Sequence, residues 1–236
     1  MEKVLQQLVD RMTKTFGDRL ISVVLYGSAA GGEHDGSYSD LNVMCVLKDI
    51  TVEELRQSEP VFHWWRGLHN PSPLLLSEDE VRTSTDCFPI EFHDMKERRR
   101  VLYGMDVVEP LVIDDSFYRA QVEHELRAKL LRLRQKAAGV MFDDKLLQQL
   151  MAESVTTFLL LIRHALRLAG YDAPFARMSI LDQAASCMQV DPQPFQKLIE
   201  WRTSNQAPSN ADSRKLLENY LAQINAVITA VDAIAK

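Results

Sequence analysis

The chain has 236 residues, enough for one large domain or two small ones, each with a sizeable core. Its apolar content of 46% and charged content of 25% are ordinary for a folded soluble protein. The formal net charge of −6 argues against a broad electrostatic grip on long nucleic acid, whereas a small nucleotide needs only a local basic patch.

The three cysteines, Cys45, Cys87 and Cys187, are widely spaced and form no CxxC pair, so they predict neither a disulfide framework nor a zinc site. The first residues lack a charged segment followed by an apolar one, and the apolar run 158–162 is too short to span a bilayer. We therefore expect a soluble, cytoplasmic protein with no membrane partner. The sequence leaves the oligomeric state open, and a homo-oligomer is compatible with it.

The first elements form a distinctive layout. Apolar residues at helical spacing predict an amphipathic helix over 2–16. Residues 21–26 are rich in β-branched and aromatic types and predict a strand that ends at Gly27. Gly27 and Ser28 then turn the chain into a short Ala-rich helix, and a loop with three glycines leads to a second strand over 39–47.

Each part of this layout is suited to binding a nucleotide. Gly27 lets the backbone approach a phosphate closely, and the start of a helix offers free N–H groups, to which Ser28 adds a hydroxyl. Along the second strand, Asp40 and Asn42 share one face. The other face is apolar: Leu41, Val43, Cys45 and Leu47. Two oxygen-bearing side chains on one face can converge on a hard cation such as Mg²⁺.

Gly27-Ser28 followed by Ser39-Asp40-x-Asn42 resembles the signature of the nucleotidyltransferase superfamily with the DNA polymerase β-like fold. The nearest resemblance is to its aminoglycoside nucleotidyltransferase-like and minimal nucleotidyltransferase branches. It implies that Gly27 and Ser28, with Ser39 from the same signature, bind ATP or another nucleoside triphosphate. It also implies a site for two Mg²⁺ ions, built by two acids in an Asp-x-Asp pattern and a third acid from a later strand.

Asn42 departs from that pattern because it stands where the family has the second Asp. Its amide oxygen can bind a metal but carries no charge. At an effective dielectric constant near 20, one unit-charge pair about 4 Å apart is worth roughly 4 kcal/mol. As an upper bound, the lost charge weakens metal binding by up to about a thousandfold. The fold prediction is unaffected, whereas activity depends on the remaining ligands.

A third acid is sought in residues 88–95, where apolar residues alternate with polar ones. Phe88, Ile90 and Phe92 share one face of a predicted strand, and Glu91 and His93 share the other. We therefore choose Glu91, which by resemblance binds the catalytic metal and deprotonates the acceptor hydroxyl. The basic run 96–100 follows at once. It is either a solvated helix face or a contact for phosphate or an acidic acceptor beside Glu91.

The remaining elements complete the fold prediction. Thr51 and Ser77 open helices with a capping-box pattern, the first of which Pro60 interrupts or restarts, and residues 74–76 predict a short strand. After about residue 115 the strand patterns stop, and four helices are predicted over 117–138, 143–169, 191–201 and 211–235. These observations and the resemblance predict an α+β protein. A mixed-sheet, polymerase β-like nucleotidyltransferase domain (1–113) precedes a helical bundle of four or five members (114–236).

Three functions are weighed. The first is an Mg²⁺-dependent enzyme that transfers a nucleoside monophosphate to a hydroxyl of a small-molecule or protein acceptor and releases pyrophosphate. Its catalytic residues are Asp40 and Glu91, and its metal ligands are Asp40, Asn42 and Glu91. The second is a degenerate relative that acts as a nucleotide-binding or protein-interaction module. The third, extension of RNA ends, is disfavoured by the acidic charge balance and by the lack of an RNA-binding appendage.

Overall fold

The computed structural model describes residues 1–31, 41–204 and 212–234. Ser39 and Asp40 therefore lie outside the described residues. The chain divides into two compact units, Met1–Tyr118 and Arg119–Lys236, and each is described by itself. The boundary that the sequence places between residues 113 and 114 falls between Tyr118 and Arg119 in the structure.

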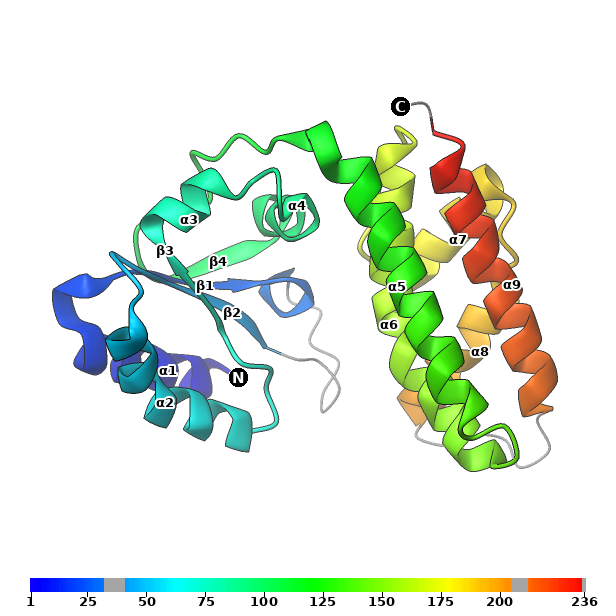
Figure 1. The fold of residues 1–236 in the computed structure, drawn as a ribbon, viewed down its shortest axis with the longest axis horizontal. Helices are drawn as coiled ribbons and strands as arrows, with labels where there is room; N and C mark the ends of the chain where they lie inside the picture. The colour runs from blue at the N-terminus through cyan, green and yellow to red at the C-terminus, as the bar shows by residue number, and fades with distance from the viewer. Residues whose placement is uncertain (32–40, 205–211, 235–236) are drawn as a thin grey trace. The chain divides into compact units, whose positions relative to one another are not determined.

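The first unit is built on a four-stranded mixed sheet with the order β3-β2-β1-β4 (Figure 1). The strands are β1 (Leu20–Tyr26), β2 (Asn42–Leu47), β3 (Leu74–Ser77) and β4 (Arg99–Gly104). β1 lies in the centre and pairs antiparallel with both β2 and β4, whereas β3 pairs parallel with β2. This sheet, followed by a helical second unit, confirms the predicted α+β class.

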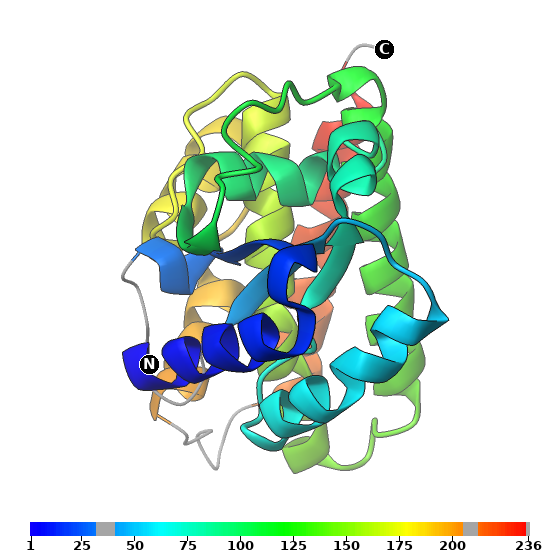
Figure 2. The ribbon, with the colours of Figure 1, turned by 90° about the vertical axis from the view of Figure 1, so that its left-hand side faces the viewer.

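Helices cover both faces of the sheet (Figures 1 and 2). One face carries α1 (Glu2–Phe16) and α2 (Val52–Gly67), and the other carries α3 (Glu78–Thr83) and α4 (Pro89–Glu97). Short 3-10 turns lie at Gly17–Arg19 (η1), Ser28–Gly31 (η2) and Asp115–Phe117 (η4). Successive side chains along a strand point to opposite faces of the sheet, so the strands contribute residues to two separate hydrophobic cores.

The capping boxes predicted at Thr51 and Ser77 are both present, and they open α2 and α3. The prediction that Pro60 interrupts or restarts this helix is wrong, since α2 continues through this residue. Pro60 is exposed, so the hydrogen bond that it cannot donate is lost on the solvent side. Val61 and Trp65 are buried in the core on the other side and hold the second half of α2 in place.

The strand predicted over 88–95 is also wrong, because this segment forms α4. Pro89 occupies the first turn, where its missing N–H costs nothing and its fixed φ suits a helix. Phe92 and Met95, three residues apart, are both buried in the core that α3 and α4 cover. Phe88, by contrast, is 48% exposed, so the apparent alternation did not mark a buried strand face. The strand comes next, as β4.

Five helices form the second unit within the described residues, where four or five were predicted: α5 (Tyr118–Ala138), α6 (Asp144–Leu168), α7 (Arg177–Met188), α8 (Gln193–Ser204) and α9 (Ser213–Asp232). α7 had no counterpart among the predicted segments. α6 packs against α7, α8 and α9. Tyr220 of α9 contacts Phe158 and Phe195 edge-on, with ring centroids 5.8 and 5.1 Å away. No helix in the described part of the chain is long and apolar enough to cross a membrane.

Gly104 ends β4 at a place where only glycine fits. Its φ is +74°, and a Cβ added there would lie 2.0 Å from the carbonyl oxygen of Ile21 in β1. We expect Gly104→Ala to lower the free energy of unfolding by more than about 4 kcal/mol, measured by urea denaturation. Gly17→Ala is the matched control, because Gly17 also has a positive φ but no atom within 4 Å of the added Cβ. Its cost is about 1–2 kcal/mol, from the backbone alone. Equal losses in the two variants would contradict this account.

Candidate functional site

The Gly-Ser turn lies where β1 ends. Gly27 has a φ of +78°, a conformation that favours glycine, and its carbonyl accepts a 3.1 Å hydrogen bond from the N–H of Ala30. Ser28 is exposed and begins η2. A Cβ added to Gly27 would lie 3.4 Å from the Nδ2 of Asn42. The structure therefore brings Asn42 close to Gly27, the first residue of the Gly-Ser turn.

Asn42 begins β2 and faces the side of the sheet that α4 covers. It is the cross-strand partner of Tyr26, so the two side chains project from the same face. Val24 and Met44 continue this face and pack against Phe92 of α4. The opposite parity is also as predicted: Leu41, Val43, Cys45 and Leu47 lie in the other core, with α1 and α2. Cys45 is thus a core residue.

Glu91 lies on the first turn of α4 and is exposed. Burial, followed by the negative charges of Glu91 and Asp94, raises the pKa of Tyr26 from its ordinary value of 10.0 to about 12. The two carboxylates are therefore close enough to act on the phenol that neighbours Asn42. Glu91 lies on a helix and not on the predicted strand. It is nevertheless on the same side of the sheet as Asn42.

The donors on this face fit a hard cation in their chemistry. Asn42 offers an amide oxygen and Glu91 a carboxylate, and oxygen ligands of this kind are those that Mg²⁺ prefers. Within residues 1–31, 41–204 and 212–234, no group of three or more His, Cys, Asp or Glu is arranged to hold a metal ion. Asp40, the acid that the sequence places beside Asn42, is outside these ranges.

Most of the basic run 96–100 is engaged within the first unit. Lys96 donates its Nζ to the carbonyl of Glu109 at 2.7 Å, and Arg100 bonds Glu2 through Nη1 at 3.0 Å. Arg99 forms an ion pair with Asp106. The sequence left two alternatives for this run: a solvated helix face, or a contact for phosphate or an acidic acceptor. These contacts favour neither for the run as a whole, because each side chain lies in a different environment.

Arg98 is the member of the run that lies against the Gly-Ser turn. Its carbonyl accepts a 3.3 Å hydrogen bond from the N–H of Gly27. Its guanidinium packs on Gly31, the last residue of η2, because a Cβ added to Gly31 would lie 2.6 Å from Nη1. The sequence singled out the basic run but not this residue, whose placement depends on how β4 follows α4.

His93, which the sequence placed beside Glu91 on a strand face, is buried in α4 instead. Its Nε2 lies 2.6 Å from Oδ1 of Asp115, and its ring centroid lies 4.8 Å from that of Tyr118. His93 thus fixes α4 to the segment that precedes α5.

The placement of Glu91 beside Tyr26 can be tested by titration. We expect Glu91→Gln to lower the pKa of Tyr26 from about 12, because one of the charges that disfavour the phenolate is removed. Absorbance at 295 nm, taken as the difference from Tyr26→Phe, isolates this phenol. Glu97→Gln, at the other end of α4, is the control and should leave the titration unchanged. An unchanged midpoint in Glu91→Gln would place Glu91 away from Tyr26.

The described residues form an α+β fold, and a solved adenyltransferase structure has a similar one. The solved structure of the spectinomycin adenyltransferase AAD(9) from Enterococcus faecialis, with ATP and spectinomycin, is similar to it with a TM-score of 0.58 and 14% sequence identity. The similarity covers 98% of this chain and 99% of that chain, so it extends over both units. No protein-family model and no curated protein matches the sequence.

Proposed function

We propose that this protein is a nucleotidyltransferase that transfers a nucleoside monophosphate from ATP, or another nucleoside triphosphate, to a hydroxyl acceptor and releases pyrophosphate. The observation that carries the proposal is the meeting of the Gly27-Ser28 turn with Asn42 on the neighbouring strand. It occurs in a chain whose fold is similar, over 98% of its length, to that of an adenyltransferase solved with ATP.

The turn supplies the phosphate contacts. Gly27 allows the triphosphate to approach the backbone, and the exposed hydroxyl of Ser28 donates a hydrogen bond to a phosphate oxygen. Ser39, from the same sequence signature, adds a second hydroxyl. Asp40, Asn42 and Glu91 would hold Mg²⁺, which when bound offsets the negative charge of the phosphates.

Glu91 is assigned the role of general base. It lies in the first turn of α4, where the helix dipole favours the ionised carboxylate, and it is exposed to an incoming acceptor. The acceptor O–H bond breaks, its proton passes to Glu91, and the oxygen bonds to the α-phosphorus. The bond from that phosphorus to the bridging oxygen breaks, and pyrophosphate leaves.

Arg98 is assigned to the triphosphate because its guanidinium lies against Gly31, the last residue of the η2 turn that Ser28 begins. We expect Arg98→Ala to weaken ATP binding about 10- to 100-fold, as loss of a charge-assisted contact of about 1.5–3 kcal/mol implies. Binding of adenosine, which has no phosphate, should change little. Calorimetric titration measures both.

Arg100→Ala is the matched control, since it removes the same charge two residues away, where the guanidinium bonds Glu2. If Arg98→Ala and Arg100→Ala weaken ATP binding equally, the effect is one of net charge. Arg98 would then have no specific role at the turn.

The reaction itself is tested with ATP, Mg²⁺ and a panel of hydroxyl-bearing acceptors, which includes spectinomycin because the structural neighbour was solved with it. Pyrophosphate should appear in equal amount to an acceptor whose mass has increased by one adenylyl group. Release of ADP and phosphate instead would contradict nucleotidyl transfer.

A second candidate is a degenerate relative that binds nucleotide, or a protein partner, without turnover. Asn42 favours it, because this residue replaces an acid of the signature with a neutral amide. ATP binding without pyrophosphate release across the acceptor panel would support this candidate over the enzyme.

A further inference from the structure

The segment between β4 and α5, residues 105–117, is tied to the first unit along its length, and we call it the strap. Val108 is fully buried in the core that α3 and α4 cover. Val107, Leu111 and Ile113 are partly buried and pack against the same core. The connection between the two units is therefore a packed part of the first unit and not a free linker.

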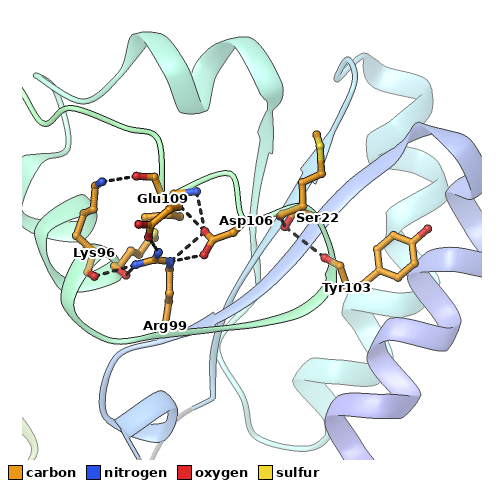
Figure 3. A network of polar contacts seen from close by, with 9 residues as sticks. Ser22, Lys96, Arg99, Tyr103, Asp106 and Glu109 are labelled. Atoms are coloured by element: carbon orange, nitrogen blue, oxygen red, sulfur yellow. Dashed lines mark hydrogen bonds and ion pairs between the residues drawn. The ribbon is translucent and has the colours of Figure 1, made fainter.

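A polar network holds the first half of the strap (Figure 3). The side chain of Arg99, the first residue of β4, is only 13% exposed. Its Nε lies 3.0 and 2.9 Å from the two carboxylate oxygens of Asp106, and its Nη2 bonds Glu109. Lys96 of α4 donates its Nζ to the carbonyl of Glu109 at 2.7 Å. Both β4 and α4 thus fix this half of the strap.

The second half of the strap ends at His93, a buried residue of α4. The Nε2 of His93 lies 2.6 Å from Oδ1 of Asp115. A carboxylate only accepts hydrogen bonds, so Nε2 carries the proton and donates it. The His93 ring also contacts the ring of Tyr118, the first residue of α5 and the last of the first unit. His93 therefore holds the point at which the chain leaves the first unit.

The two halves of the strap differ in what their opening would expose. Asp106 accepts hydrogen bonds from the backbone N–H groups of Val108 and Glu109, so opening the first half breaks these bonds and exposes a buried valine. In the second half, the side chain of Asp115 is 58% exposed, and Phe117 is 59% exposed. Local opening begins where least apolar surface is buried, so we expect the strap to open from its His93 end.

We propose that His93 and Asp115 form a latch that controls movement between the two units. While their hydrogen bond is made, the first turn of α5 moves together with α4. When the bond opens, residues 114–118 become the hinge about which the second unit moves, and the first half of the strap stays in place. The inference rests on these contacts alone and is independent of the proposed function.

The hinge is tested by hydrogen exchange of the full chain, followed by mass spectrometry. Asp115→Ala removes the acceptor from an exposed position, so the fold should be kept. We expect exchange in peptides covering residues 112–122 to be about tenfold faster, as loss of one hydrogen bond to a half-exposed charged acceptor implies, and exchange in 105–111 to be unchanged. Unchanged exchange over 112–122 would overturn the inference.

Glu109→Ala is the matched control, because it removes the same charge from an exposed position in the other half of the strap. It should leave exchange over residues 112–122 at the native rate. Equal acceleration there in Glu109→Ala and Asp115→Ala would contradict a latch at His93. Asp115→Asn keeps the shape of the side chain and covers the case in which Asp115→Ala does not fold. It should accelerate exchange by a smaller factor.

Movement between the units is read by pulsed electron resonance between spin labels on Cys87 and Cys187. These cysteines belong to the first and second units and are not fully buried, whereas Cys45 is buried. The distribution of distances between the labels should be broader in Asp115→Ala than in the native protein or in Glu109→Ala. An unchanged width would show that the bond orders the strap without restraining the second unit, which would overturn the latch. A protein that does not bind ATP would refute the proposed function and leave both measurements decisive.

Discussion

Glu91→Gln is expected to lower the rate of pyrophosphate release by about 10²- to 10⁴-fold, the range for loss of a general base. The amide keeps the shape of the side chain but does not accept a proton at neutral pH. Because Glu91 is exposed, the free energy of unfolding should stay within about 0.5 kcal/mol of the native value. A coupled pyrophosphate assay and a urea denaturation curve measure the two quantities.

Glu97→Gln is the control for this effect. Glu97 is also exposed and also belongs to α4, but it lies at the far end of the helix. Its replacement should leave turnover unchanged. Unchanged turnover in Glu91→Gln as well would show that another residue accepts the proton, with Asp94 of the same helix as the next residue to replace.

Asn42→Asp is expected to raise Mg²⁺-dependent nucleotide binding by up to about a thousandfold, because it restores one negative charge beside the predicted metal. The two side chains have nearly the same shape, so the contact with Gly27 and the pairing with Tyr26 should be kept. Calorimetric titration with ATP at fixed Mg²⁺ measures the gain.

The same titration in EDTA is the internal control for Asn42→Asp. Without the metal, the added carboxylate repels the triphosphate, so binding should become weaker than in the native protein. Asn42→Asp should thus strengthen ATP binding when Mg²⁺ is present and weaken it when Mg²⁺ is absent. A variant that shows no gain with Mg²⁺ would mean that position 42 does not limit metal binding.

The core of the candidate site could be predicted from the sequence because it depends on short-range rules. The apolar run before Gly27 and the alternation after Leu41 determine which strands form and which face Asn42 occupies. In the structure, Asn42 lies next to the turn and opposite Tyr26, a pairing that the local pattern did not specify. Asp40 and Ser39 remain predictions, since they lie outside the described residues.

Glu91 shows where such rules fail. Three apolar residues at alternate positions suggested a strand, although Pro89 at a helix start and the pair Phe92 and Met95 fit a helix equally well. A nine-residue helix is too short for its period to dominate the pattern. The choice between the two was settled by tertiary packing against Val24 and Met44, which a local pattern does not contain.

The roles of Arg98 and Arg99 could not be predicted for a similar reason. Arg98 meets Gly31, a residue far away in the sequence. Arg99 finds Asp106 and Glu109 seven and ten residues further on, through a turn whose shape depends on Gly104. Within the sequence both arginines belong to one basic run, and only the contacts of the folded chain separate them.

The measurement that tests the central claim most directly is a calorimetric titration of the native protein with ATP, with and without Mg²⁺. The account predicts binding in the micromolar range that requires Mg²⁺, with Gly27-Ser28 holding the phosphates and Asn42 and Glu91 beside the metal. Absence of binding for ATP and for the other three nucleoside triphosphates, with the protein shown to be folded, would contradict it.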